Sequence, residues 1–308
     1  MEMPLRIGID LGGTKTEGVV IDNLGNTISC HRKKTPINNY AETINTICEI
    51  VSILCNEVCL PNEAPVGIGI PGALSMNNGL VKNANSVWLI GRPLGRDLKV
   101  ALSRDVRIEN DANCFTVSEA FDGAGKGLNI VFGIILGTGV GGGVTINGKV
   151  WSGKNLIAGE WGHNPLPWPA SPKDSTYEDH EQPGPPCYCG KSGCIETFLS
   201  GPGLALDHGT GDSAKKINTL AIQGDTLAQA SLKRYENRLA RALSTIINTI
   251  DPDAIILGGG LSNIGSLYNN VPLIWDRWVF SDNCKTSLLK NVHGDSSGAR
   301  GAAWLWNS

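Results

Sequence analysis

The chain has 308 residues, with 26 Lys and Arg against 29 Asp and Glu and a formal net charge of -3. This length is enough for two domains with cores of their own. The near balance of charge, without a basic run of five or more residues, speaks against broad nucleic-acid binding. No apolar run reaches the roughly 18 residues that a membrane span needs, so we expect no membrane partner.

The composition also bears on the cellular compartment. The sequence holds 39 Gly and 9 Cys. An odd number of cysteines with irregular spacing fits a reducing cytosol better than a disulfide framework. The opening residues MEMPLRIGID lead directly into a strand pattern, without the charged and apolar regions of a signal peptide. We therefore expect a cytoplasmic, loop-rich α/β protein.

The N-terminal pattern predicts three short strands joined by turns. Residues 5–10 (LRIGID) and 16–21 form the first two, with a turn over 11–15 (LGGTK) between them. A further turn over 22–26 leads to a strand over 27–33. This arrangement is a hairpin meander, and neither G-x-G-x-x-G nor G-x-x-x-x-G-K-[ST] occurs here.

A helix is predicted over residues 40–60, capped by Asn38 or Asn39. Its apolar residues repeat at spacings of three and four, which assigns Cys48 and Cys55 to the core.

Two later strands end in polar or turn-forming residues. The apolar segment 66–70 ends at Pro-Gly, and the strand over 106–109 ends at Asn110 and Asp111, before a helix over 112–121. Open α/β sheets place their ligands at such strand ends.

The opening pattern then returns in the middle of the chain. A strand over 130–136 is followed by a glycine-rich turn over 137–143 (GTGVGGG) and a second strand over 144–146. Asn147-Gly148 is a type I′ hairpin signal before residues 149–151. This weak internal repeat of strand, Gly/Thr turn and strand predicts two related domains.

The last third is mainly helical. Residues 226–250 show a long helical period that Asp251-Pro252 ends. A buried strand over 254–257 leads into Gly258, Gly259 and Gly260, and a closing helix is predicted over 296–306.

One stretch, residues 159–196, concentrates metal-binding side chains. His163, Cys187, Cys189 and Cys194 form a Cys₃His set, which suits a closed tetrahedral shell for structural zinc. Gly190 and Gly193 let the chain fold back between the last two cysteines. A disulfide or unrelated buried thiols are the alternatives, and the dense spacing favours zinc.

Carboxylates flank this metal stretch on both sides. Glu160 lies three residues before His163, and Glu196 lies two residues after Cys194. A metal that ties the loop together would also fix these two acidic groups for substrate binding.

The glycine turns point to phosphate binding. Glycine lets backbone N–H groups approach an anion closely, and Thr14 and Thr138 can add hydroxyl donors. Asp10, at the end of the first strand, is suited to hold Mg²⁺ through water. Plain hairpin turns are the alternative for any one copy, whereas two matching turns and a later Gly₃ favour a nucleotide.

Several motifs, in this order, resemble the repressor–ORF–kinase (ROK) family of sugar kinases: DLGGT, NDAN, GTGVGGG, GEWGH, CYCGKSGCIE and DPDAIILGGG. The resemblance covers essentially the whole chain. Within the family, VKNANSVWL, GEWGHNPLPW and HGDSSGARGAAWLW look most like the fructokinase branch, and the N-acetylglucosamine kinase branch comes next.

The resemblance implies an actin-like, ribonuclease-H-like fold of two α/β domains with a central cleft. We expect a small N-terminal domain over 1–111, completed by the helix at 296–308, and a large domain over 112–295. It also implies ATP, Mg²⁺ and structural zinc as cofactors, and a homodimer. Some members of the family carry an added N-terminal DNA-binding domain, but we expect none here, because the first strand is predicted to start by about Leu5. The segment Trp168–Pro186 is less typical and receives no role.

Carried over residue by residue, the resemblance implies three groups of contacts. The ATP-binding residues are Gly8, Ile9, Asp10, Leu11, Gly12, Gly13, Thr14, Lys15, Gly137, Thr138, Gly139, Val140, Gly141, Gly142, Gly143, Val144, Gly258, Gly259 and Gly260. The sugar-binding residues are Asn85, Asn110, Asp111, Glu160, His163 and Glu196, with Asp111 as catalytic base. The zinc ligands are His163, Cys187, Cys189 and Cys194.

The sequence therefore predicts an ATP-dependent hexose kinase, with D-fructose as the first acceptor, phosphorylated at its 6-hydroxyl, and mannose as a further one. N-acetylglucosamine or glucose kinase activity is the alternative within the family. A sugar-sensing regulator and an actin-like or chaperone-like ATPase are the rivals from other classes.

Overall fold

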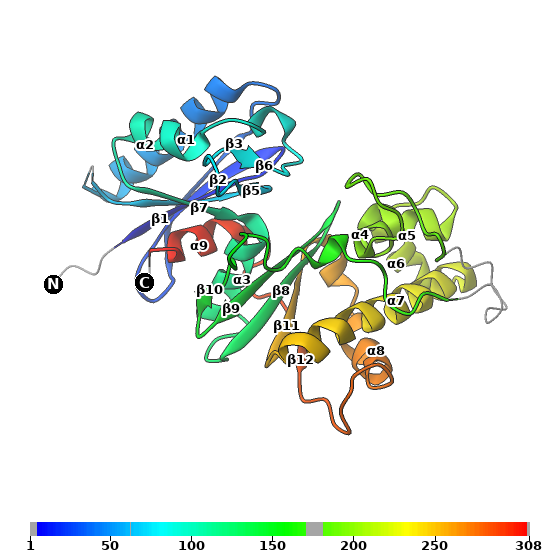
Figure 1. Ribbon diagram of the computed structural model, residues 1–308. Coiled ribbons are helices and arrows are strands. Elements are labelled where there is room, and N and C mark those ends of the chain that lie inside the picture. The colour runs from blue at the N-terminus through cyan, green and yellow to red at the C-terminus, as the bar shows by residue number, and fades with distance from the viewer. Residues whose placement is uncertain (1–4, 62, 171–180, 307–308) are drawn as a thin grey trace. The chain divides into compact units, whose positions relative to one another are not determined.

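The computed structural model describes residues 5–61, 63–170 and 181–306. The chain divides into two compact units (Figure 1). Unit 1 comprises residues 1–128, 143–158 and 292–308, and unit 2 comprises residues 129–142 and 159–291. Among the described residues, no helix has the length and apolarity required to cross a membrane.

The sheet of unit 1 confirms the predicted meander. Its strand order is β3-β2-β1-β4-β7. The strands are β3 (Thr27–Lys34), β2 (Lys15–Ile21), β1 (Arg6–Leu11), β4 (Val66–Ile70) and β7 (Val106–Asn110). Neighbours β1, β2 and β3 pair antiparallel, whereas β4 runs parallel to both β1 and β7. The carboxyl ends of β1, β4 and β7 therefore lie at one edge of the sheet.

Helices cover both faces of this sheet. The helices are α1 (Tyr40–Val58), α2 (Leu94–Leu102), α3 (Asp111–Phe121) and α9 (Ser297–Trp304). Helix α1 starts at the predicted cap, where Asn39 accepts from the backbone N of Glu42. Its buried face and that of α2 enclose one apolar core, while α3 and α9 enclose another across the sheet (Figure 1).

Glycines allow α9 to lie directly on the strands. A Cβ at Gly8 in β1 would come within 2.0 Å of the Ala299 carbonyl, and one at Gly67 in β4 within 1.8 Å of the Ala302 carbonyl. Any side chain at these positions would push the helix away. The C-terminal helix is thus an integral part of unit 1.

The second sheet has the order β10-β9-β8-β11-β12. Its strands are β8 (Ile130–Leu136), β9 (Val140–Ile146), β10 (Lys149–Val150), β11 (Ala254–Gly258) and β12 (Ser287–Lys290). Strand β11 runs parallel to β8 and β12, and β10 pairs antiparallel with β9. This order repeats that of the first sheet, as the internal repeat predicts.

Unit 2 contributes the remaining helices. They are α4 (Ile195–Leu199), α5 (Gly201–His208), α6 (Ala214–Ile222), α7 (Thr226–Ile250) and α8 (Ser266–Trp275). The span of α7 is the predicted one, and Asp251 ends it in the left-handed conformation. Helices α2, α4, α5, α6 and α8 and strand β12 were not predicted.

Short elements fill the connections. They are the strands β5 (Ala73–Leu74) and β6 (Val81–Lys82) and the 3₁₀ turns η1 (Val87–Leu89), η2 (Trp161–His163), η3 (Gly260–Asn263) and η4 (Gly294–Ser296).

Two predicted boundaries differ from the structure by more than two residues. The turn predicted over 137–143 is shorter, because β9 already begins at Val140. Gly142 and Gly143 belong to this strand, and a Cβ on either would meet neighbouring atoms at less than 3 Å. These glycines therefore serve close packing and not the turn. The division also places α3 in unit 1, where the sequence set a domain boundary after Asp111.

Candidate active site

The first glycine turn joins β1 to β2 in unit 1. Gly12 N donates to the Lys15 carbonyl at 3.0 Å, and Thr35 Oγ1 donates to the Gly12 carbonyl at 2.7 Å. Lys15 Nζ lies 3.2 Å from the Asp295 carboxylate. The turn is thus held at its base, and a Cβ at Gly13 would meet no atom closer than 3.8 Å. A phosphate-binding turn needs such space at its tip, because the anion must reach the backbone N–H groups.

Asp10 is the penultimate residue of β1. Desolvation by the surrounding protein, and then the negative charges of Asp111 and Glu17, raise the pKa of Asp10 to about 7, against the opposing charge of Lys15. Part of the residue nevertheless stays exposed to solvent. A divalent cation would relieve this concentration of negative charge, so the surroundings of Asp10 fit the predicted Mg²⁺.

The strand β7 ends at Asn110, and α3 begins at Asp111. The Asn110 side chain caps the helix, because its Oδ1 accepts from the backbone N of Ala112 at 2.9 Å and of Asn113 at 3.3 Å. Its Nδ2 donates to the Gly72 carbonyl at 2.9 Å. Asn110 is therefore the N-cap, which leaves at most one amide N–H for the sugar contact predicted for it.

Asp111 occupies the first helical position instead. There the helix dipole favours the ionised carboxylate, the form that a general base requires. Its Oδ1 lies 2.8 Å from the backbone N of Ala112.

Glu109 supports this strand end and was missed by the sequence reasoning. Its Oε1 accepts from the backbone N of Asn110 and from Asn113 Nδ2, both at 2.9 Å. Its Oε2 accepts from Ser152 Oγ at 2.7 Å. Three consecutive polar residues at the end of a strand are the signal that could have revealed it. Asn85, also predicted for sugar, is exposed in the bend before η1.

The second glycine turn lies in unit 2. Gly137 N donates to the Gly139 carbonyl at 3.0 Å, and Gly201 N donates to the Gly137 carbonyl at 2.8 Å. Glu196 Oε2 accepts from the backbone N of Val140 at 2.8 Å. A Cβ at Gly139 would lie 2.6 Å from that carboxylate oxygen, so only glycine allows this contact.

A cavity of about 830 Å³ opens beside this turn. Its lining combines the turn, the starts of α5 and α6, and η3: Gly137, Thr138, Gly201, Pro202, Ala205, Ser213, Ala214, Lys215, Asn218, Gly260, Leu261, Asn263 and Ile264. The size and mixed lining suit a nucleoside. Gly258 ends β11, and Gly259 makes the turn with a φ of 78°.

Sequence reasoning missed the helical wall of this cavity. The start of α5 carries a readable signal, since Ser200 caps the helix and Pro202 follows within its first turn. Lys215 and Asn218 on α6 carry none, because that helix was not predicted.

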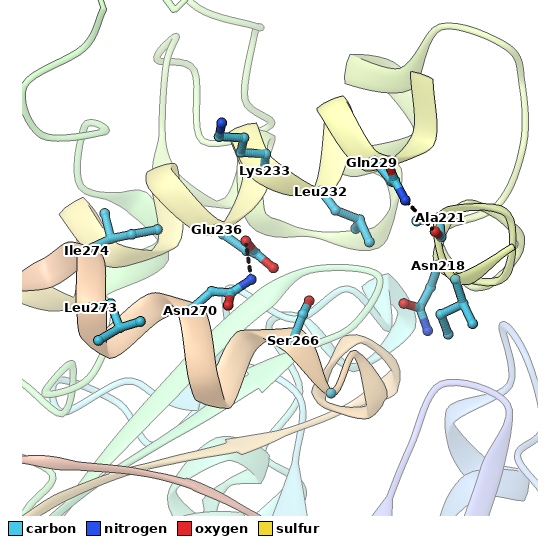
Figure 2. A pocket seen from close by; sticks show the side chains of 12 residues that line it. Asn218, Ala221, Gln229, Leu232, Lys233, Glu236, Ser266, Asn270, Leu273 and Ile274 are labelled. Atoms are coloured by element: carbon cyan, nitrogen blue, oxygen red, sulfur yellow. Dashed lines mark hydrogen bonds between the residues drawn. The ribbon is translucent and has the colours of Figure 1, made fainter. Parts of the chain in front are cut away.

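A second cavity, of about 690 Å³, lies between α6, α7 and α8. Figure 2 shows its apolar side chains, among them Leu232 and Leu273, and the hydrogen bond of 2.9 Å from Asn270 Nδ2 to Glu236. Asn218 lines both cavities. The residues predicted for ATP, sugar or metal are absent from the described lining of this second cavity.

The predicted metal ligands come together in unit 2. The ligand atoms of His163, Cys187, Cys189 and Cys194 lie within 4.8 Å of one another. The sulfurs of Cys189 and Cys194 are 3.6 Å apart, and Cys187 Sγ is 3.5 Å from His163 Nδ1. Tetrahedral zinc, with Zn–S bonds of about 2.3 Å, places its sulfur ligands roughly 3.7 Å apart. These two separations match that geometry, and the residue types fit the predicted zinc site.

The metal loop has the predicted tight turns. Gly190 and Gly193 adopt φ values of 86° and 70°, a region that favours glycine. Cys187 N donates to the Lys191 carbonyl at 2.8 Å, which closes the turn.

Tyr188 lies against the outer side of the histidine ring. Its hydroxyl is 2.9 Å from His163 Nε2, and the two rings meet edge to face. Desolvation of the hydroxyl, and then the charges of Glu196 and Glu160, raise the pKa of Tyr188 to about 12. The ring itself remains exposed. The sequence analysis assigned Tyr188 no role.

A buried ion-pair network joins Glu181, which precedes the metal ligand Cys187, to helix α7. Glu181 pairs with Arg238 at 2.8 Å and with Arg241 at 2.7 Å, both from α7. Arg241 also donates to the carbonyls of Pro167 and Trp168. These contacts give a structural role to the described ends of Trp168–Pro186; residues 171–180 of this segment lie outside the described residues.

The predicted site residues thus form two sets. Unit 1 holds Asp10, Asn85, Asn110 and Asp111 with the first turn, and the charge of Asp111 acts on Asp10. Unit 2 holds Glu160, His163 and Glu196 with the metal cluster, the turn at Gly137 and the nucleoside-sized cavity.

Comparison with known proteins identifies relatives over nearly the full chain. The chain is 38% identical over 303 residues to the N-acetyl-D-glucosamine kinase of Vibrio cholerae and 39% identical over 302 residues to that of Salmonella paratyphi B. Each match covers 97% of this chain and 98% of the relative.

Solved structures agree with the fold. The ROK hexokinase of Thermus thermophilus matches with a TM-score of 0.84 and 27% identity, covering 98% of this chain and 97% of that one. A ROK family glucokinase from Streptomyces griseus, in complex with glucose and AMPPNP, matches with a TM-score of 0.78 and 29% identity, covering 98% of each chain.

These neighbours confirm the actin-like fold. The preference for the fructokinase branch is not confirmed, since the curated relatives carry the name of the branch placed second. The family model matches residues 6–308, and the chain therefore belongs to the ROK family.

Proposed function

We propose that this protein is an ATP-dependent sugar kinase that phosphorylates the 6-hydroxyl of a free hexose, with N-acetyl-D-glucosamine as the leading acceptor. The curated relatives, 38% and 39% identical over almost the whole chain, support this acceptor over fructose. The ROK family model supports the kinase class.

One contact carries the proposal. Glu196 follows the metal ligand Cys194 by two residues, and its Oε2 accepts from the Val140 N–H of the second glycine turn at 2.8 Å. The loop that carries sugar-binding candidates is therefore bonded directly to the turn that borders a nucleoside-sized cavity. This contact suits an enzyme that handles a small polar acceptor and a nucleotide together.

In this proposal the residues of unit 1 supply the acid–base chemistry. Phosphoryl transfer needs positioning, charge neutralisation and a carboxylate that accepts the hydroxyl proton. Asp111 is assigned as that base, because it stands at a helix start, where the helix dipole favours an ionised carboxylate, and because the contacts of Glu109 and Asn110 fix the strand end that precedes it. Asp10 and the first turn would hold Mg²⁺, which neutralises phosphate charge when bound.

The residues of unit 2 bind and orient. Glu160 and Glu196 accept from ring hydroxyls, and the turn at Gly137 with its cavity takes the nucleotide. His163, Cys187, Cys189 and Cys194 would hold zinc, which shapes the loop when bound. Four protein ligands fill a tetrahedral shell, so the zinc is structural.

D-Fructose is the second candidate acceptor. The specific observation in its favour is the set of segments VKNANSVWL, GEWGHNPLPW and HGDSSGARGAAWLW, which resemble fructokinases more than other members of the family. Hexoses differ in one or two hydroxyl positions, and contacts within the pocket decide between them.

A coupled assay with Mg²⁺-ATP and each of N-acetylglucosamine, fructose, mannose and glucose tests the proposal. We expect the highest kcat/KM with N-acetylglucosamine. A higher value with fructose would assign the second candidate. Sugar binding without turnover would indicate a regulator, and sugar-independent ATP hydrolysis would indicate an ATPase.

A further inference from the structure

The second cavity, of about 690 Å³ between α6, α7 and α8, has a buried carboxylate in its wall. Glu236 of α7 is only 5% exposed, and Asn270 Nδ2 of α8 donates to its Oε2 at 2.9 Å. Its Oε1 accepts no hydrogen bond from the residues that the structure describes. Figure 2 shows the carboxylate turned into the space between α7 and α8, on the side where the Ser266 hydroxyl lies. The cavity wall therefore contains an acceptor with spare capacity.

The charge of Glu236 has no cation beside it. The buried carboxylate of Glu181 pairs with Arg238 and Arg241 of α7, whereas no ion pair joins Glu236 to any described residue. Lys233 also lines the cavity, but Figure 2 shows its side chain pointing away from Glu236. Burial of a carboxylate without a cation costs free energy. A positively charged group of a ligand would reduce that cost.

Apolar side chains surround this charged point. Leu232 and Ile274 line the cavity, together with Ile222 and Leu273, which are 79% and 76% exposed. Large apolar side chains that stay exposed around a concave surface favour contact with an apolar ligand. The lining thus suits a small molecule that combines one cationic group with an apolar body.

This cavity is distinct from the nucleoside-sized one beside the second glycine turn. Among the described lining residues, the two have only Asn218 of α6 in common. The turn at Gly137 and the segment at Gly260 line the nucleoside-sized cavity alone. A ligand in the second cavity therefore leaves the contacts proposed for the nucleotide in place.

We propose that the cavity between α6, α7 and α8 is a second ligand site, which binds a protonated primary amine carried on an apolar body. An ammonium group has three N–H donors, so it can donate to Glu236 Oε1 and to the Ser266 hydroxyl oxygen together. The apolar body lies against Leu232 and Leu273. The inference goes beyond the proposed function and uses no residue assigned to sugar, zinc or proton transfer. The opposing possibility is that water alone solvates Glu236 in an open groove.

Phenethylamine and phenethyl alcohol are the probes, because they share the ring and chain and differ in the charge of the end group. NMR titration of the wild-type protein should give a Kd of about 1 mM or below for the amine. The alcohol should bind at least about tenfold more weakly, because hydrogen bonds between charged groups are the stronger ones. Saturating ADP should leave the affinity for the amine unchanged.

Two variants locate the amine. Glu236→Gln keeps the size of the side chain and can still accept from Asn270, so the fold should be retained. Its Kd for the amine should rise at least about tenfold, whereas its Kd for the alcohol should not change. Leu273→Trp adds bulk at an exposed position of the lining and should weaken the binding of both probes.

Glu57→Gln is the matched control. This carboxylate lies in unit 1, is exposed and pairs with His31 at 2.7 Å. The same acid-to-amide change at this position should leave both Kd values unchanged.

Any of four results would overturn the inference. They are equal affinity of the wild type for amine and alcohol, no binding of the amine in the millimolar range, displacement of the amine by ADP, and an amine Kd that is unchanged in Glu236→Gln or in Leu273→Trp. Displacement by ADP would assign the amine to the nucleoside-sized cavity. Failure of the proposed function is separate, because the titration needs neither sugar nor turnover.

Discussion

The carboxylates beside the two glycine turns have opposite surroundings. Asp10, next to the first turn, is crowded by Asp111 and Glu17, and its pKa is raised to about 7 by desolvation and these charges. Glu196, next to the second turn, accepts the backbone N–H of Val140 at 2.8 Å. A carboxylate with surplus negative charge suits a bound cation or a proton transfer, whereas one bonded to the backbone suits positioning.

The matched strands extend this contrast. The segment GIDLGGTK in β1 aligns with GIILGTGV in β8, so that Asp10 corresponds to Ile135 and Lys15 to Val140. Asp10 and Ile135 are both partly exposed. The same backbone pattern is therefore charged in unit 1 and apolar in unit 2. In the proposed function, the first turn therefore serves ionic chemistry and the second turn binds through its backbone.

The strongest test of this contrast is Asp111→Asn, a nearly isosteric change. If Asp111 is the general base, loss of its proton acceptor should lower kcat by about 10² to 10⁴-fold. Sugar affinity should stay within a few-fold, because the amide keeps the size of the side chain. Steady-state assay and calorimetry on this variant decide the assignment. A kcat within about tenfold of wild type would mean that Asp111 is not the base.

The variant Glu181→Gln tests whether a buried carboxylate of unit 2, paired with two arginines, has a structural role. The carboxylate pairs with Arg238 and Arg241 in a buried setting. Breaking such a pair is strongly destabilising, and we expect a loss of about 3 kcal/mol in the free energy of unfolding, measured by urea titration. The wild-type kcat should be nearly retained at 25 °C. Loss of kcat with unchanged stability would contradict a structural role.

The free energy of unfolding of the wild-type protein should fall as the pH is lowered. Burial raises the pKa of Glu181, but the hydrogen bond and charge of Arg241 and the hydrogen bonds from the Ala170 backbone N–H and from Arg238 outweigh it, so the pKa is lowered overall. A folded-state pKa below the unfolded value of about 4.3 gives stability that is present above that pH and lost as pH falls through the folded-state pKa. The wild type should therefore lose stability on acidification more steeply than Glu181→Gln.

Cys189→Ser tests the metal assignment. Wild-type protein purified without added metal should contain one zinc per chain, and the variant less than half an equivalent. Because the loop carries Glu160, His163 and Glu196, we expect sugar affinity to fall at least about tenfold as well. Cys284→Ser is the control, a free cysteine of unit 2 outside the cluster. Wild-type protein with less than half an equivalent of zinc would refute the site.

Which features could be predicted from the sequence depends on how far apart the interacting residues lie along the chain. Short apolar runs predicted the spans of β4 and β8 to the residue, and helical periodicity predicted that of α7. The metal cluster was also readable, because four soft ligands with glycine punctuation have few other uses. Contacts between distant segments were not readable. Glu109 with Ser152, Glu181 with α7, and Tyr188 with His163 each join residues more than 20 positions apart.

The glycines of residues 137–143 also show what could not be predicted from the sequence. In the sequence GTGVGGG all five glycines indicated one long turn, but Gly141, Gly142 and Gly143 lie in β9. Gly142 is required by Trp161 and the Gly159 carbonyl, and Gly143 by Thr116 and Ala112, through close approach. Sequence alone does not distinguish a glycine needed for its dihedral angles from one needed for its lack of a side chain.

The smallest effect is expected for Glu196→Gln. This variant tests directly whether the carboxylates beside the two glycine turns have different roles. The Gln amide keeps an oxygen that can accept from the Val140 N–H, so the second turn should keep its conformation. We expect the KM for ATP to stay within about threefold, since only the extra strength of a charged acceptor is lost. Glu196→Ala removes the acceptor altogether, and its KM for ATP should rise about tenfold or more. The same acid-to-amide change would thus be severe at Asp111 and mild at Glu196. A Glu196→Gln variant whose kcat falls as far as that of Asp111→Asn would show that charge, and not backbone positioning, is what the second turn needs from its carboxylate.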